Sequence, residues 1–350
     1  IKAGPGAYER LMDGSGVWDR ISAYFGPAAG PRWLVASGFD LALMRAERLG
    51  RVLPVWLIGS SAGAWRFASW LQPEPEKSYE ALREAYTQMS YRRGDTPEQI
   101  HAALLDVINA YLEDDAIPFA LNHKRYRLAV LTARTRHLAA SEVGWVQKGG
   151  LALCLIGNLF GRANLRHFAE RIVFFSGPRP PAFCLRPDFR GRFFRLSPNN
   201  FKQAVLASGA IPLVVTGVRD IFGAPRGVYR DGGLIDYHLT HDFALRADDL
   251  VLFFHHQERI VPGWLDKKLP RRKPAPEVLD RVLMVFPSEA FLERLPYGKV
   301  PDRDDFLTFI DDPAERIRYW RRTVEMAAPL GEMFLELVES GRIRRVLERF

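Results

Sequence analysis

Short apolar runs and helix-like stretches alternate along the first third of the chain. The run Ile21–Phe25 predicts a strand that ends at Gly26, and the composition of Val52–Ile58 predicts a second, buried strand. The segments Trp33–Leu49 and Ala62–Leu71, which each follow a strand, have the character of helices. Strands and helices in alternation are typical of an α/β fold.

Residues 96–99 have the pattern of a helix start. Thr96 suits the N-cap, Pro97 suits the first turn, and Gln99 can close a capping box. Apolar residues then recur at helical spacing, at Ile100, Leu104, Leu105, Ile108 and Leu112. We therefore predict a helix that begins here.

Further along the chain, three more buried strands are predicted, at Arg127–Thr132, Arg171–Phe175 and Val251–Phe254. Asn199–Ala207 predicts a short helix, and the Pro- and Arg-rich stretch Gly177–Arg195 predicts a loop. After Pro313 the chain is expected to be mainly helical.

These elements together predict a three-layer α/β/α architecture, with a central, mostly parallel sheet between helices on both faces. We expect one catalytic domain over residues 1–260. Residues 261–350 are expected to form a largely helical extension that packs on the same domain.

Composition places the chain among globular proteins, with 47% hydrophobic and 26% charged residues. Its formal net charge of +8 favours anionic partners. The basic residues concentrate at Arg186–Arg195, Lys267–Lys273 and Arg316–Arg349. Because no nucleic-acid-binding motif is present, an anionic membrane surface is a candidate partner and nucleic acid is not. Solvated basic faces without a partner are the equally simple alternative.

Neither a membrane span nor a metal site is expected from the sequence. The longest apolar runs, such as Leu151–Ile156 and Ala210–Val215, are too short to cross a bilayer, and no charged-then-apolar leader is visible. We therefore expect a cytoplasmic protein. Cys154 and Cys184 lie in apolar surroundings, and no Cys/His cluster has metal-ligand spacing, so neither a metal nor an organic cofactor is expected.

The pentapeptide 59–63 reads Gly-Ser-Ser-Ala-Gly and lies between a predicted strand and a predicted helix. A nucleophile elbow requires this context, because its serine sits on a strained turn with the hydroxyl exposed. Gly59 and Gly63 would relieve crowding on either side of Ser61, and the N–H of Ala62 could bind an oxyanion. The simpler reading is a tight turn that packs a helix on a strand.

A second motif, Asp231-Gly232-Gly233, lies far downstream and is preceded by the block Ala207–Pro212, which reads Ala-Ser-Gly-Ala-Ile-Pro. Alone, Asp-Gly-Gly indicates a turn. The order of the elbow, this block and the Asp-Gly-Gly motif resembles the patatin-like phospholipase family. The resemblance covers residues 20 to 240, and the last third of the chain matches no motif of that family.

The resemblance implies a patatin-like fold and a serine lipid acyl hydrolase of the phospholipase A or lysophospholipase type. Ser61 would be the nucleophile and Asp231 its base, in a dyad without histidine. The substrate would be an acyl lipid, cleaved at a carboxylic ester through an acyl-enzyme. A carboxylate with an ordinary pKa of about 4 is a weak base, so the dyad would need a partly desolvated pocket.

The family also has a glycine-rich oxyanion loop after the first strand, which corresponds to residues 28–32, read Ala-Ala-Gly-Pro-Arg. Two glycines of the family pattern are alanines here, and Pro31 has no N–H to donate. Ala29 and Gly30 can still donate, and Arg32 brings positive charge. With Ala62, these residues are the predicted oxyanion site.

Two other functions remain open at this point. A classical α/β-hydrolase could use Ser61, Asp231 and His256 as a triad, although His255 and His256 are more readily assigned a structural or surface role. A catalytically inactive lipid-binding protein could keep the same fold and basic surface. Separately, Gly341–Phe350 predicts an amphipathic helix, with Ile343, Val346, Leu347 and Phe350 on one face, that docks on a membrane or on its own domain.

Overall fold

A single central sheet organises the chain in the computed structural model, which describes residues 1–14 and 16–350. Its strands are β1 (Lys2–Ala3), β2 (Ile21–Gly26), β3 (Val55–Ser60), β4 (Tyr126–Thr135), β5 (Ala169–Phe175), β6 (Gly191–Arg195), β7 (Val218–Arg219), β8 (Val228–Asp231), β9 (Leu250–Phe254), β10 (Val282–Val285) and β11 (Glu348–Arg349). The 11 strands of the described residues run in the order β11-β1-β10-β9-β2-β3-β4-β5-β6, with β8 beside β4 and β7 beside β8.

The sheet is mostly parallel, as the sequence predicts for an α/β fold, and the predicted fold class is confirmed. Parallel pairing joins β10, β9, β2, β3 and β4 in turn. Antiparallel pairing occurs where β4 meets β5 and β8, between β7 and β8, and between β1 and β10. The segment 261–350 supplies β10 and β11 to this sheet in addition to its helices.

The α-helices are α1 (Pro5–Met12), α2 (Val17–Arg20), α3 (Ser37–Ala46), α4 (Ala62–Trp70), α5 (Pro75–Gln88), α6 (Pro97–Tyr111), α7 (Ile117–Leu121), α8 (Gly144–Phe160), α9 (Phe201–Ser208), α10 (Pro276–Leu279), α11 (Glu289–Leu292), α12 (Asp305–Thr308), α13 (Pro313–Ala327), α14 (Pro329–Glu339) and α15 (Ile343–Val346). The 3₁₀ helices are η1 (Gly30–Ala36), η2 (His137–Ala140), η3 (Arg162–His167), η4 (Ala182–Leu185), η5 (Gly232–Leu234), η6 (Trp264–Asp266) and η7 (Pro296–Gly298).

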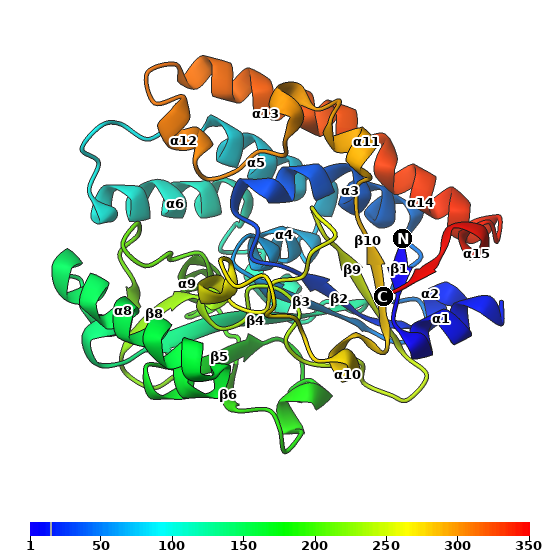
Figure 1. The fold of residues 1–350 in the computed structure, drawn as a ribbon, viewed down its shortest axis with the longest axis horizontal. Helices are drawn as coiled ribbons and strands as arrows, with labels where there is room; N and C mark the ends of the chain where they lie inside the picture. Colours follow the sequence, from blue (N-terminus) through cyan, green and yellow to red (C-terminus); the bar gives the residue numbers. More distant parts are fainter. Residues whose placement is uncertain (15) are drawn as a thin grey trace.

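The two faces of the sheet are covered differently. Alternate side chains of β2 point to opposite faces, so Tyr24 packs under the long helices α3, α4, α5, α6, α13 and α14, which form the upper layer in Figure 1. Ala23 and Phe25 face the other side, where η4 with Phe183, α10 and the loop that carries Phe243 cover them. The helix α8 covers the β4–β5 end of that second face through Leu151.

Several predicted elements differ in extent from those observed. The strand predicted at Val52–Ile58 begins only at Val55, because Pro54 precedes it and Val52 is exposed. The helix predicted over Trp33–Leu49 is split into η1 and α3. The predicted loop Gly177–Arg195 contains η4 and the strand β6, which pairs with β5 at the edge of the sheet. The capping box predicted at Thr96 and Gln99 is confirmed.

The amphipathic helix predicted over Gly341–Phe350 is wrong. Only the single turn α15 forms, and the chain then extends so that β11 pairs with β1. Ile343 and Leu347 are buried, whereas Val346 and Phe350 are exposed, so the four apolar residues do not share a face. Backbone pairing at the sheet edge has replaced the helix.

A buried ion pair ties the upper layer to the sheet. Arg66 of α4 makes two hydrogen bonds of 2.7 Å to the carboxylate of Asp40 in α3, and both side chains are fully buried. The hydroxyls of Tyr24 in β2 and Tyr79 in α5 also donate to this carboxylate. One carboxylate therefore connects three helices and a central strand.

We predict that Asp40→Asn lowers the free energy of unfolding by about 3 to 5 kcal/mol, because it leaves the buried Arg66 guanidinium without a counter-charge. Denaturant unfolding followed by circular dichroism measures the loss. The matched control is Glu74→Gln, which removes the exposed partner of Lys77 and should cost less than about 1 kcal/mol. Equal effects of the two substitutions would contradict the prediction.

Candidate active site

Two strands meet end to end along one edge of β4. The strand β3 pairs in parallel with the first half of β4, up to the partners Ser60 and Leu131. The strand β8 pairs antiparallel with the second half, beginning at Asp231 opposite Thr132. Because β3 and β8 run towards each other, the residues at their ends, Ser61 and Asp231, are brought together.

The hydroxyl of Ser61 donates a hydrogen bond of 2.7 Å from Oγ to Oδ2 of Asp231. The other carboxylate oxygen, Oδ1, accepts a hydrogen bond of 2.7 Å from the N–H of Gly233. This second bond fixes the carboxylate so that Oδ2 faces the serine. The two residues that the sequence singles out as a nucleophile and base are therefore in direct contact.

Ser61 has the strained backbone of a nucleophile elbow, with φ of 53° and ψ of −125°. A positive φ at a residue with a side chain costs about 1–3 kcal/mol and persists only where the surroundings enforce it. The enforcing contact is close packing: a Cβ added to Gly63 would lie 2.0 Å from the carbonyl oxygen of Gly26, and one added to Gly59 would lie 2.4 Å from Ala64. These clashes agree with the crowding expected on each side of an elbow serine.

Ser208, inside the Ala207–Pro212 block, holds the elbow in place. Its hydroxyl accepts a hydrogen bond of 2.8 Å from the N–H of Ser61 and donates one of 2.7 Å to the carbonyl of Leu131. The block thus links the elbow to β4, and the backbone N–H of Asp231 binds the carbonyl of Ala210 in the same block. The sequence motif identified this block, but it did not reveal that Ser208 binds both the elbow and β4.

The carboxyl group of Asp231 has an unusual affinity for its proton. Burial raises its pKa from 3.8 to about 6, against the opposing influence of the hydrogen bonds from Ser61 and Gly233. A carboxylate with this pKa is largely ionised at neutral pH and still accepts a proton more readily than an ordinary aspartate.

A cavity of about 370 Å³ opens over the dyad. Ala29, Gly30 and Arg32 of the predicted oxyanion site line it together with Ser61 and Asp231. Ala62 is absent from its described lining and begins α4, so its N–H lies at the positive end of that helix.

The N–H groups of Ala29 and Gly30 are available to a ligand. Among the described residues neither donates to a protein acceptor, whereas the N–H of Ala28 is bound to the carbonyl of Tyr237. Gly30 has a φ of 55°, and a Cβ there would meet open space. Pro31 removes one donor from the loop, and the two that precede it remain.

The cavity also contains residues that motif analysis missed. Three cations, Lys267, Lys268 and Arg303, line it together with the apolar side chains of Ile211, Leu234 and Trp264. The only signal for them was the basic run that starts at Lys267. These residues come from α9, η5, η6 and α12 or their flanks, so their convergence depends on the tertiary fold.

Three histidines form a buried cluster nearby. His238, His255 and His256 have ring nitrogens within 4.8 Å of one another, and no sequence pattern pointed to His238. A surface role for the pair 255–256 is wrong, since both are buried. Within the described chain, neither ring nitrogen of His256 has a hydrogen-bond partner, so no hydrogen bond connects it to Ser61 or Asp231.

The positions of the imidazole protons decide whether this cluster suits a metal ion. Nδ1 of His238 accepts a hydrogen bond from the N–H of Val261, so the neutral ring carries its proton on Nε2. Nε2 of His255 faces the carbonyl of Arg259, which leaves Nδ1 with a lone pair. Two imidazole lone pairs remain, fewer than the three protein ligands of a catalytic zinc site. Burial lowers the pKa of all three rings, and the cluster therefore fits a neutral, structural role.

Comparison with known proteins adds little to this geometry. No protein-family model matches the sequence, and no curated protein matches it. Among solved structures, the chain is similar to VipD from Legionella pneumophila, with 12% sequence identity, a TM-score of 0.38, and coverage of 90% of this chain and 67% of that chain. At this level of similarity, no property of VipD is transferred to this chain.

We predict that Gly63→Ala destabilises the protein by several kcal/mol, because its methyl group would overlap the carbonyl of Gly26. The matched control is Gly149→Ala in α8, where an added Cβ meets nothing within 4 Å, and it should stabilise by up to about 1 kcal/mol. Thermal unfolding of the two variants compares them directly. A Gly63→Ala protein as stable as the control would contradict the crowding.

Proposed function

We propose that this protein is a serine acyl hydrolase of the patatin-like kind, which cleaves carboxylic esters of acyl lipids through an acyl-enzyme. The observation that carries the proposal is the 2.7 Å hydrogen bond from Ser61 Oγ to Asp231 Oδ2 at a strained elbow. A hydroxyl, an adjacent base and free N–H groups over one cavity are what acyl transfer requires.

In the first half of the reaction, Ser61 Oγ attacks the ester carbonyl while its proton passes to Oδ2 of Asp231. The N–H groups of Gly30 and Ala62 would stabilise the oxyanion that develops. The N–H of Ser61 is already bound to Ser208, so it does not contribute. Collapse of the tetrahedral intermediate breaks the bond to the alcohol, which leaves with the proton held by Asp231.

In the second half, a water molecule attacks the acyl-enzyme and gives its proton to Asp231. The acid product then leaves as the C–O bond to Ser61 breaks, and the proton returns to Oγ. Asp231 begins and ends the cycle ionised. Gly233 binds Oδ1 throughout, so the carboxylate needs no reorientation between the two halves.

The lining of the cavity supports a lipid as the substrate. Ile211, Leu234 and Trp264 offer apolar contact for an acyl chain, and Lys267 and Arg303 bring positive charge to the same space. An amphiphile with an apolar chain and an anionic head group matches both features. The family resemblance at residues 59–63 and 231–233 points to the same substrate class.

We predict that Ser61→Ala and Asp231→Asn each lower kcat/KM for a soluble p-nitrophenyl ester by about 10⁴-fold or more, because the two groups act as one unit. Both variants should fold, since each substitution is nearly isosteric. Release of fatty acid from phospholipid vesicles by the unsubstituted protein tests the lipid substrate separately.

The control for this prediction is His256→Ala, which should keep most of the activity once the protein is shown to be folded. A triad would make this histidine as indispensable as the serine. A folded but inactive His256→Ala protein would therefore replace the dyad with a classical α/β-hydrolase mechanism. Full activity of Ser61→Ala would exclude both mechanisms.

The raised pKa of Asp231 predicts opposite pH dependences for activity and stability. Activity needs the ionised base, so kcat/KM should rise as pH increases through about 6. The folded protein, however, binds this proton more tightly than the unfolded chain, whose aspartate has a pKa of 3.8. The stabilisation is therefore complete below about pH 4 and is lost as pH rises through about 6, a change of about 3 kcal/mol.

Asp231→Asn separates these two effects, because an amide does not titrate. We expect this variant to lack activity and to be more stable than the unsubstituted protein at pH above about 7. Denaturant unfolding across the pH range measures the difference. An Asp231→Asn protein that loses the same stability over the same pH range would show that another group is responsible.

A further inference from the structure

The helix α8 presents an apolar face to solvent. Lys148 is its only charged residue. The exposed large apolar side chains are Trp145, Leu153, Leu155, Ile156, Leu159 and Phe160. Trp145 is 78% exposed and Phe160 85% exposed, and these two aromatic residues stand at opposite ends of the helix. A surface helix ordinarily has polar residues on this side.

The polar residues of α8 point inward instead. Gln147 accepts a hydrogen bond of 2.6 Å from the N–H of Leu213, and Asn158 donates one of 2.7 Å to Asp266. Both side chains are buried. The distribution is therefore inverted, with hydrogen-bonding groups satisfied by the protein and apolar groups left outside, as expected for a helix whose outer surroundings are not water.

These inward contacts attach α8 to two sides of the cavity over Ser61. Leu213 directly follows Pro212, which lines the cavity, and Asp266 lies between the lining residues Trp264 and Lys267. Leu151 of α8 packs in the same cluster as Leu234 and Trp264. Whatever covers the outer face of α8 therefore lies beside the candidate active site.

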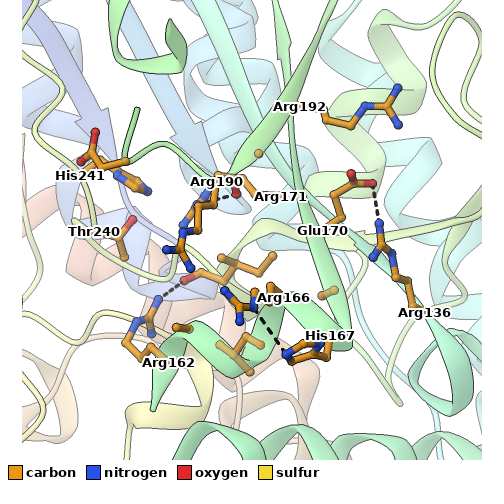
Figure 2. A pocket seen from close by; sticks show the side chains of 16 residues that line it. Arg136, Arg162, Arg166, His167, Glu170, Arg171, Arg190, Arg192, Thr240 and His241 are labelled. Atoms are coloured by element: carbon orange, nitrogen blue, oxygen red, sulfur yellow. Dashed lines mark hydrogen bonds and ion pairs between the residues drawn. The ribbon is translucent and has the colours of Figure 1, made fainter. Parts of the chain in front are cut away.

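A basic pocket lies next to the carboxyl end of α8. It has a volume of about 510 Å³ and is lined by six arginines but only two carboxylates, Glu170 and Asp188. Figure 2 shows Arg162, Arg166 and Arg190 gathered around it, with Arg162 and Arg166 in η3, which follows α8.

Half of these arginines lack a counter-charge. Arg136, Arg162 and Arg171 form ion pairs with carboxylates. In residues 1–14 and 16–350, the lining arginines without a carboxylate partner are Arg166, Arg190 and Arg192. Guanidinium groups bind phosphate with bidentate geometry, so this pocket is suited to a phosphate-bearing head group.

We propose that the outer face of α8 is the docking surface for an anionic lipid bilayer, and that the arginines of the adjacent pocket contact lipid phosphates. The helix lies in the plane of the interface, with Trp145 and Phe160 inserted among the acyl chains. The cavity over Ser61 then opens at the membrane surface. The benefit to catalysis rests on the proposed function, whereas the docking itself does not.

Charge favours a bilayer over a second copy of the chain. A dimer through α8 would add the uncompensated arginines of a second copy to the same interface, between two chains that each have a net charge of +8. Anionic lipid supplies the opposite charge and an apolar interior in one surface.

The test measures sedimentation of Ser61→Ala protein with phosphatidylcholine vesicles, with and without phosphatidylglycerol. This background cannot consume the vesicles by the proposed reaction, so binding is scored apart from catalysis. We expect binding that requires phosphatidylglycerol and falls at least about tenfold with Trp145→Ser and Phe160→Ser combined. The matched control is Met333→Ser, an exposed apolar residue of α14, which should bind normally.

A second pair of substitutions tests the contribution of charge to vesicle binding. Arg166→Glu with Arg190→Glu should weaken binding to phosphatidylglycerol vesicles at least about tenfold and reduce its dependence on salt. The control pair Arg318→Glu with Arg322→Glu on α13 changes the net charge by the same amount as the pocket pair and should bind like the Ser61→Ala parent. Equal losses in both pairs would show a non-specific effect of net charge and overturn the pocket assignment.

Two results would overturn the docking surface itself. One is unchanged vesicle binding by the Trp145→Ser and Phe160→Ser protein, shown to be folded by its thermal unfolding. The other is a dimer in light scattering that the same substitutions dissociate, which would mean that a second copy covers α8. Binding by the Ser61→Ala parent in the absence of any esterase activity in the unsubstituted protein would support docking and refute only the proposed function.

Discussion

The division of one strand edge between two partners determines where the candidate active site of this protein lies. The strand β4 is long enough to pair with β3 along its first half and with β8 along its second. Since these two partners run in opposite directions, their ends must approach each other, and a serine after one meets an aspartate at the end of the other. Gly232 permits the approach, because a Cβ there would lie 2.2 Å from the carbonyl of Leu131.

Two features of the site oppose folding, and the packing around the site offsets their free-energy cost. A positive φ at Ser61 and a buried carboxylate at Asp231 both oppose folding. Around them, the Arg66–Asp40 pair joins three helices to β2, and glycines at 26, 59 and 63 let α4 approach the sheet closely. The helix that follows the strained serine is thus also held to its neighbours by buried polar contacts. The residues that stabilise this part of the fold differ from the serine that is proposed to react.

Local patterns in the sequence predicted local features, but they did not predict long-range contacts. The strand at residues 21–26 and the capping box at Thr96 follow from apolar runs and side-chain chemistry within a few residues. The pairing of Ser61 with Asp231 was suggested only by family resemblance, because periodicity carries no information about residues 170 positions apart. The prediction of an amphipathic helix at the end of the chain was wrong for a related reason. The strand β1, at the other end of the chain, provides backbone hydrogen-bond partners that local helix propensity does not take into account. The exposure of the outer face of α8 could not be predicted from the sequence. Apolar residues in a sequence indicate burial, but they do not indicate whether protein or another medium buries them.

The same pairing of β1 with β11 places residues 1 and 350 side by side at one margin of the sheet, whereas β5, β6 and α8 lie at the other (Figure 1). A tether attached to either end therefore leaves the molecule from the same side. Immobilised through such a tether on a sensor chip or a bead, every molecule would turn α8 outward. The pairing of these two short strands thus gives the protein a built-in orientation, one that a surface-based measurement could use without any change to the sequence between its ends.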